Sequence, residues 1–286
     1  MPTDEAVAYV IDVEFVWGYQ ATIAGLTKSP PPYTYPPPTT ILGALAEAIA
    51  RSEGLGEDSL PTIMNALTKD LIAIALKPLN CVPIKYQDIN RVIVFKEVGK
   101  TKIRYPSLKD LQGSFDAPAR GKTVLVSLSR DSPKIRWVMA WLRNPIIKMS
   151  TRTQEIPLSP KHVWRIHRVG SKESLASVVN VLKKPAKILR SDTEEGTSFS
   201  FPLKAVSKYE PEGRWVVESY ANPFKPYAEG ESPALRYLKG DVIPFATPVP
   251  TAVDEEPVAW VTPSREGTLL EVGVKGVGVV VGVTKS

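Results

Sequence analysis

Two histidines are the only side chains in this sequence whose ordinary pKa suits acid–base chemistry near neutral pH. They are His162 and His167 in "SPKHVWRIHRVG", flanked by Lys161, Arg165 and Arg168. A spacing of five places them on opposite faces of a strand, and about 140° apart on a helix. Because such a pair cannot easily act together as acid and base, we interpret the segment as a phosphate-binding strip. We expect no catalytic residue.

Metal and redox chemistry find no support in the sequence. Cys81 is the only cysteine, which excludes an intrachain disulfide, and no Cys/His cluster has the spacing of metal ligands. The C-terminal "GVKGVGVVVG" is neither a Walker motif nor a dinucleotide fingerprint, and we interpret it as a terminal strand. We therefore expect no metal and no cofactor.

A second candidate site is the proline-rich stretch "WGYQATIAGLTKSPPPYTYPPP", residues 17–38. Its prolines enforce an extended backbone that joins neither a sheet nor a helix, and their stiffness lowers the entropic cost of holding rings in place. Rigid aromatic rings beside a cation suit single-stranded nucleic acid, whose bases stack while its phosphates contact ammonium groups. The candidate RNA-binding residues here are Trp17, Tyr19, Gln20, Lys28, Tyr33 and Tyr35.

The same stretch has a structural interpretation. Trp17 can end a buried strand, and the two tyrosines can cover the helix that follows. For Trp17 we favour this interpretation, whereas for Lys28, Tyr33 and Tyr35 both remain open.

Positive charge is concentrated in the middle of the chain. Residues 77–168 carry 19 basic and 6 acidic side chains, a net charge of +13, whereas residues 1–76 carry −6 and residues 191–286 carry −5. A basic centre between acidic ends is typical of a surface that binds a polyanion. The charge distribution therefore indicates nucleic-acid binding.

The elements that must position these residues indicate an α+β fold. Alternating apolar residues predict a half-buried strand over 7–17, and apolar stripes predict helices from Thr39 or Thr40 to near Gly54 and from Asp58 or Ser59 onward. Further segments resemble strands at 71–76, 91–98 and 123–129, a short helix at 171–182, and a basic excursion at 97–122. After residue 190, strand-like pieces alternate with Pro/Gly turns, and residues 221–256 read as irregular.

The composition indicates the kind of source and the cellular location of the protein. The 27 prolines among 286 residues and the scarcity of thermolabile residues fit a heat-adapted source. No signal peptide is visible, and the valine-rich tail is too short to span a bilayer and contains charges. We expect a cytoplasmic protein without membrane contact.

The N-terminal region resembles the CRISPR-associated Cas-five family of the RAMP superfamily. The family's aromatic–Pro–Pro–Pro–Ser/Thr–x–x–Gly–Ala–Leu run is matched by "YPPPTTILGAL", residues 35–45. With "WGYQ" at 17–20 and "GLTK" at 25–28, the match is most similar to the archaeal subtype A of type I systems. Residues beyond about 130 carry no matching motif.

The resemblance implies a fold and a role. The fold is a ferredoxin-like (RRM/RAMP) domain over residues 1–190, with a thumb inserted around 97–122 and a smaller β-rich C-terminal region at 191–286. The role is to hold the five-prime handle of crRNA in the surveillance complex Cascade for antiviral defence. The partners are the backbone and large subunits, and target DNA indirectly. We place Lys100, Lys102, Arg104, Arg120 and Lys122 of the basic insertion on RNA phosphates.

Two other functions remain as alternatives. Some relatives cut their own pre-crRNA without metal, using Tyr, Lys and His, and Tyr19, Lys28 and His162 are the matching residue types here. The chain can also be a scaffold that contacts RNA little. A steep loss of RNA affinity with rising salt would exclude the scaffold, because it reports several phosphate contacts.

Overall fold

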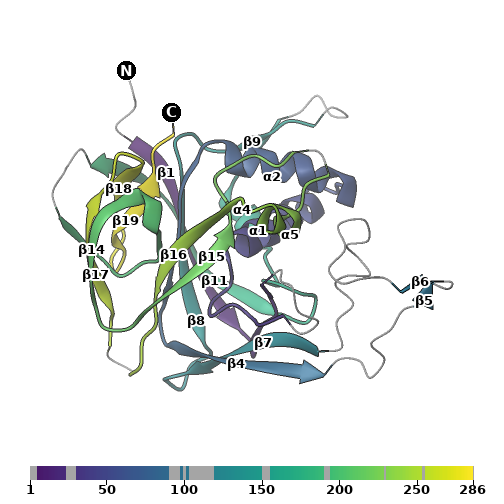
Figure 1. Cartoon of the computed structure of the whole chain (residues 1–286). Helices are drawn as coiled ribbons and strands as arrows, with labels where there is room; N and C mark the ends of the chain where they lie inside the picture. Colours follow the sequence, from purple (N-terminus) through teal and green to yellow (C-terminus); the bar gives the residue numbers. More distant parts are fainter. Residues whose placement is uncertain are drawn as a thin grey trace.

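A six-stranded antiparallel sheet forms the centre of the molecule, in the order β19-β18-β11-β1-β8-β3 (Figure 1). The computed structural model describes residues 5–23, 30–89, 97–98, 101–102, 119–149, 155–189, 194–228, 230–252 and 255–285. Helices and strands occur together, which confirms the expected α and β mixture. The sheet strands are β1 (Glu5–Phe15), β3 (Leu71–Pro78), β8 (Lys134–Trp141), β11 (Ala176–Leu189), β18 (Gly267–Val272) and β19 (Gly278–Val283).

Two helices cover one face of this sheet. α1 (Pro38–Ser52) and α2 (Leu60–Lys69), the latter preceded by the 3-10 turn η1 (Glu57–Ser59), lie where apolar stripes predicted them. Their stripes pack on the rings of Trp137 and Trp141 in one core, and the Trp141 indole donates to the carbonyl of Leu67 at 2.6 Å. α1 begins one residue before the expected cap, at Pro38, and has no side-chain N-cap bond.

The other face of the sheet is covered as well. A second core of mostly small residues, including Ala8 and Ala75, lies there beneath Phe199 and Val277. β19 packs closely against β3. Gly282 of β19 lies so near the backbone of Ile72 that a Cβ on it would be 2.5 Å from the Ile72 carbonyl oxygen. β1 is therefore buried on both faces, and even the charged side chain of Asp12 is only 7% exposed. It accepts two bonds from Arg136, at 2.7 and 2.9 Å.

The segment 171–182, expected to be a helix, is largely strand. β11 begins at Ala176, where buried Ala176 and Val178 alternate with exposed Ser177 and Val179. The helical prediction was wrong because this run of β-branched residues has a period of two and pairs along β1 from Phe15 to Glu5.

The C-terminal region divides its strands among several sheets. β12 (Glu195–Thr197), β14 (Val206–Glu212) and β17 (Val258–Pro263) form one sheet; β13 (Phe201–Pro202), β15 (Trp215–Ala221) and β16 (Val242–Pro248) form another. The 3-10 turn η2 (Leu203–Ala205) connects β13 to β14, and α5 (Pro233–Leu238) precedes β16. Residues 221–256 are thus less irregular than expected. The division at residue 190 stays a prediction, although β18 and β19 join the central sheet.

A three-stranded sheet in the order β2-β7-β4 follows β3, and its β4–β7 ribbon leads to the basic insertion. β4 (Cys81–Ile89) pairs with β7 (Ala119–Ser127), and β2 (Gly18–Tyr19) lies on the other side of β7. Figure 1 shows this ribbon along the lower edge of the view. The remaining short elements are β5 (Glu97–Val98), β6 (Thr101–Lys102), β9 (Ile146–Ile147), β10 (Ile156–Pro157) and α4 (Pro160–Val163). None of the helices in the described ranges is long and apolar enough to cross a membrane.

Candidate nucleic-acid interface

The proline strap, residues 30–38, is buried rather than laid across the surface. The side chains of Tyr33 and Tyr35 are 5% and 0% exposed, and Tyr19 and Gln20 are equally covered. Stacking a base on a ring requires an open ring face, which none of these side chains offers. The expectation that they contact RNA is therefore wrong for this structure, and the alternative of a covering role holds.

Segments from distant parts of the chain bury the strap. The hydroxyl groups of Tyr19 and Thr123 both donate to the carbonyl of Tyr33, and the Tyr35 hydroxyl donates to the carbonyl of Cys81 at 3.2 Å. Burial raises the pKa of Tyr19 and of Tyr35 well above 10. A tyrosine that stays protonated at neutral pH and bonds internally cannot serve as a general base.

Glu218 of β15 anchors the middle of the strap. Its carboxylate accepts from the backbone N–H and the hydroxyl of Thr34, at 2.9 and 2.7 Å, and from Lys85 of β4 at 2.7 Å. Three segments thus meet at one carboxylate. The strap positions the N-terminus of α1 and does not form a binding lip.

Trp17 and Lys122 meet at the outer side of the ribbon. The Trp17 indole donates to the carbonyl of Glu173 at 2.9 Å, while the Lys122 ammonium lies 5.9 Å from the Trp17 ring and 3.8 Å from the Glu173 carboxylate. Trp17 is half-buried and lies two residues beyond Phe15, the last residue of β1, so the strand ends earlier than expected. These two residues remain a secondary candidate contact.

Four other sequence-predicted residues belong to the basic insertion, and Lys28 precedes the strap in the sequence. Lys28, Lys100 and Arg104 lie outside the described residues. Lys102 lies in β6 and Arg120 in β7, and only their backbones are described. Their assignment to RNA phosphates stays a prediction.

His162, expected in the phosphate-binding strip, is a structural residue. Its side chain is completely buried, its Nδ1 accepts from the backbone N–H of Ser159 at 3.2 Å, and its Nε2 lies 2.9 Å from the Glu53 carboxylate. Ser159 and His162 together form the capping box of α4. A fully buried imidazole cannot reach a phosphate, so the RNA-binding prediction was wrong here.

The neighbouring cations form a surface cluster. We call Arg51, Lys161, Arg165, His167, Arg168 and the carboxylates Glu47 and Glu53 the α1–α4 cluster. Arg51 connects α1 to the segment that follows α4, because its guanidinium donates to the carbonyl of Arg165 and to Nδ1 of His167, both at 2.9 Å. The structure thus brings together four of the predicted residues, Lys161, Arg165, His167 and Arg168.

The charges in the cluster are only partly balanced. Glu47 pairs with Arg51 at 3.0 Å and lies 3.9 Å from Arg168, and Glu53 pairs with Lys161 at 2.9 Å. Hydrogen bonds from Lys161 and then His162 lower the pKa of Glu53, which keeps that carboxylate ionised. Four permanent cations face two carboxylates, and in the described chain no carboxylate pairs with Arg165. The excess positive charge is available to an anionic ligand.

Packing within the chain does not explain the glycine at position 43 of α1. A Cβ on Gly43 would meet no atom within 4 Å, so the packing of α1 does not require a glycine at this position. Gly43 faces outward in the stripe that also carries Glu47 and Arg51. Gly18 in "WGYQ" is different: it has φ +143°, and a Cβ would overlap the carbonyl of Thr123.

The same substitution at these two glycines should therefore have opposite effects. Gly43→Ala should raise the free energy of unfolding by about 0.5–1 kcal/mol, since alanine is the better helix former. Gly18→Ala should lower it by about 2–3 kcal/mol through backbone strain and overlap. Urea denaturation of both variants tests this, and a loss of stability in Gly43→Ala would show that α1 does pack at that position.

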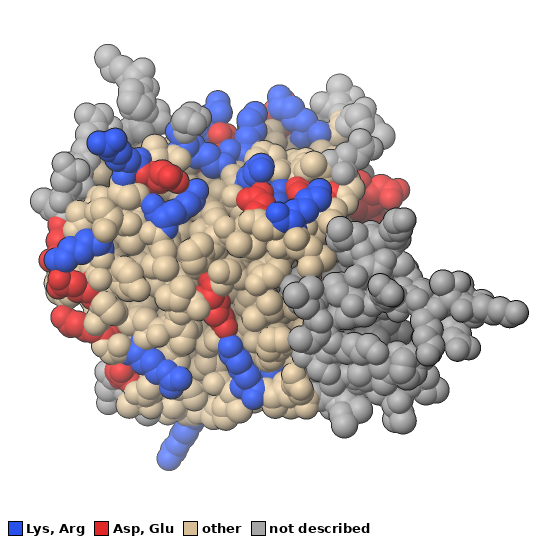
Figure 2. All heavy atoms as spheres, viewed as in Figure 1, with Lys and Arg blue, Asp and Glu red and all other residues tan. Residues whose placement is uncertain are grey.

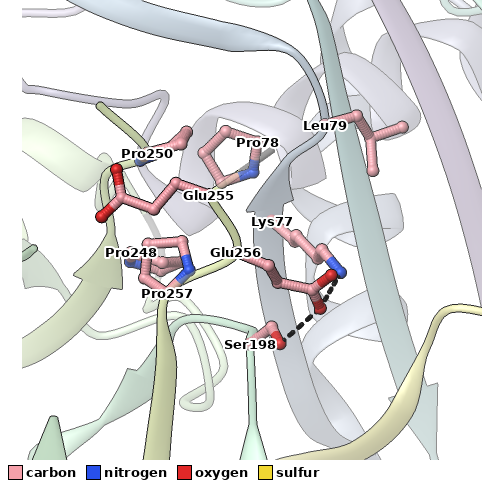
Figure 3. Close-up of a pocket in the computed structure, with 9 residues that line it drawn as sticks. All are labelled: Lys77, Pro78, Leu79, Ser198, Pro248, Pro250, Glu255, Glu256 and Pro257. Atoms are coloured by element: carbon pink, nitrogen blue, oxygen red, sulfur yellow. Dashed lines mark hydrogen bonds and ion pairs between the residues drawn. The ribbon is translucent and has the colours of Figure 1, made fainter. Parts of the chain in front are cut away.

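A small pocket lies between the β3–β4 turn and the C-terminal sheets, away from the cluster (Figure 3). Its volume is about 150 Å³, and prolines such as Pro248 and Pro257 form its walls. Its polar groups bind one another, because Glu256 accepts from Lys77 at 2.5 Å and from Ser198 at 2.7 Å. With these groups already paired, the pocket offers little to a ligand.

Charged side chains of both signs are interspersed on the face drawn in Figure 2. On the face drawn in Figure 2, basic and acidic side chains alternate along the upper edge, and much of the centre is uncharged. The central excess of Lys and Arg in the sequence does not form one continuous band on that face. This distribution makes the α1–α4 cluster the best-defined candidate site.

Sequence reasoning missed two members of this surface, Arg51 and Trp164. Arg51 lies 114 residues from Arg165, so only the fold brings them together. Trp164 was visible in "KHVWRIHR" as an aromatic residue among cations, and it is 50% exposed. That combination is the signal that could have identified it.

The chain is similar to known proteins in both sequence and fold. A family model described as CRISPR-associated protein (Cas_Cas5) matches residues 8–249. A solved structure of a CRISPR protein from Archaeoglobus fulgidus is similar, with 38% identity and a TM-score of 0.67, over 97% of this chain and 100% of that chain. Among curated proteins, no significant match was found. From the family match over most of its length, the chain belongs to the CRISPR-associated Cas5 family.

Proposed function

We propose that the chain is a non-catalytic crRNA-binding subunit of a type I surveillance complex, Cascade, in which it holds the repeat-derived five-prime handle. Within that complex it contacts the backbone and large subunits, and target DNA only indirectly. An archaeal, heat-adapted source of subtype A and a cytoplasmic location belong to the same proposal.

The observation that carries this proposal is the α1–α4 cluster. It provides exposed cations with an excess of positive charge on a surface held rigid by a hydrogen-bonded turn. Phosphate contacts of this kind supply most of the affinity of proteins for nucleic acid. Family membership identifies crRNA as the nucleic acid to test first.

The proposal of a non-catalytic role is supported by the state of the candidate catalytic residues. Tyr19 and His162 are both buried and hydrogen-bonded within the chain. A metal-independent ribonuclease needs its acid and base within hydrogen-bond reach of the scissile phosphate.

The same proposal includes a ferredoxin-like core and a thumb inserted into it. The strand order β11-β1-β8-β3, with helices after β1 and between β8 and β11, supports a ferredoxin-like core in which β1 and β8 are central. The β4–β7 ribbon is inserted between two core strands, where the thumb would begin. We assign the thumb to residues 97–122 on this basis.

The test is binding of a labelled, repeat-derived RNA by the purified chain over a series of salt concentrations. We expect the RNA to be bound, recovered at full length without metal, and released steeply as salt rises. A flat salt dependence with weak binding would favour the scaffold. Defined cleavage within the repeat would favour the endoribonuclease, and either result would contradict the proposal.

A further inference from the structure

Trp164 presents a large apolar ring to solvent from the segment that also carries the cations Lys161, Arg165 and Arg168 of the α1–α4 cluster. Half of its surface is exposed, whereas Trp137 and Trp141 in the central sheet are completely buried. Exposing an indole forgoes the free energy that burial of so large an apolar surface provides. A functional contact would explain why the ring remains outside.

The turn that carries Trp164 is rigid. Its backbone N–H donates to the carbonyl of Pro160 at 3.0 Å, and the next two residues donate to the carbonyls of His162 and Val163. Val163 and Ile166 are buried on either side, and His162 ties the turn to Glu53 of α1. A side chain on such a fixed turn loses less conformational entropy when it binds.

The segment around Trp164 also carries exposed cations. Lys161 is three residues before it, with a side chain that is 64% exposed, and Arg165 follows it directly and is exposed. Arg168 lies four residues beyond the ring and is also accessible. This excess of positive charge favours a polyanion over the apolar face of another protein.

No partner in the described part of the chain uses the indole N–H of Trp164. In contrast, Trp17, Trp215 and Trp260 donate theirs to the chain, the last to the Glu212 carboxylate at 2.9 Å. Trp260 is similarly exposed, at 41%, but it lies beside an acidic side chain. It therefore provides a matched comparison.

We propose that Trp164 is a base-stacking residue, on which an unpaired base of the bound RNA rests while its neighbouring phosphates contact Arg165, Lys161 and Arg168. The inference rests on the proposed RNA-binding function and adds the residue that recognises a base. Stacking on an aromatic ring accepts any base, so Trp164 contributes affinity and position rather than sequence selectivity.

The experiment measures binding of a labelled, single-stranded, repeat-derived RNA to the full chain carrying Trp164→Ala, Trp164→Leu, Trp164→Phe or Trp260→Ala. We expect Trp164→Ala and Trp164→Leu to weaken binding about 5- to 150-fold. Trp164→Phe should keep most of the affinity, because it retains an aromatic face, and Trp260→Ala should bind like the wild type. The salt slope should stay unchanged in all four, since no phosphate contact is removed.

Fluorescence gives a second measurement. RNA should quench part of the wild-type tryptophan emission, and this part should be absent in Trp164→Phe. If the wild type binds RNA with a steep salt dependence but Trp164→Ala binds equally well, the stacking inference is overturned and the proposed function stands. If the wild type shows no salt-dependent binding, the proposed function fails as well.

Discussion

Replacing Lys161, Arg165 and Arg168 together by alanine should weaken binding of a repeat-derived RNA by about 100-fold at about 0.1 M salt. Each phosphate contact on a single strand adds about 0.7 to the slope with which the logarithm of the binding constant falls as the logarithm of the salt concentration rises. At about 0.1 M salt, which is one logarithmic unit below 1 M, each contact therefore contributes roughly 0.7 logarithmic units of affinity. The slope itself should fall by about 2. Binding measured at several salt concentrations gives both quantities.

A second triple variant separates a local site from a general effect of charge. Lys208, Lys225 and Lys239 are exposed cations of the C-terminal region, and their removal changes the net charge by the same amount. We expect this variant to bind RNA nearly as well as the wild type, with an unchanged slope. Equal losses in the two triple variants would mean that RNA responds only to overall charge, and the α1–α4 cluster would not be the site.

Local sequence patterns predicted the elements well where one segment alone determines the outcome. The alternation of apolar residues from 7 to 17 corresponds to β1, and the apolar stripes correspond to α1 and α2. Each of these signals depends on the period of a single stretch. The family resemblance came from the same region, where the proline strap leads into α1.

The fate of the strap tyrosines was not predictable from the same stretch. Six prolines determine that the chain is extended, but they do not determine which other segments lie over it. β15 provides Glu218 for Thr34, and β7 provides Thr123 for Tyr33. These partners are separated from the strap by 184 and 90 residues along the chain. Burial is a property of the tertiary fold, so composition alone left both interpretations open.

The candidate site shows the same division. Lys161, Arg165 and Arg168 were predicted because they are close in sequence, and the structure keeps them together on the surface. His162 was predicted for the same reason, yet one turn of α4 directs it inward to Glu53. Proximity in sequence therefore pointed to the candidate site, while the direction of each side chain required the fold.

The hydrogen bonds of one buried cation explain why residues 222–241 have a defined structure, although their sequence predicted an irregular segment. Arg236 of α5 is completely buried and donates to the carbonyls of Asn222, Lys225 and Pro226 at 2.7–2.8 Å, and to the Glu231 carboxylate at 2.6 Å. Its guanidinium also lies 3.9 Å from the Tyr227 ring. One side chain thus ties together a loop that has few regular backbone bonds.

Arg236→Met should lower the free energy of unfolding by about 3–5 kcal/mol, because it leaves the half-buried Glu231 carboxylate and three carbonyls without their donor. Arg236→Lys should recover only part of this loss, since an ammonium group lacks the planar fork that reaches several acceptors at once. Exposed Arg214→Met is the control, and it should change stability by less than about 0.5 kcal/mol. Urea denaturation at neutral pH measures all three variants, and a value for Arg236→Met near that of Arg214→Met would show that the loop keeps its structure without the guanidinium.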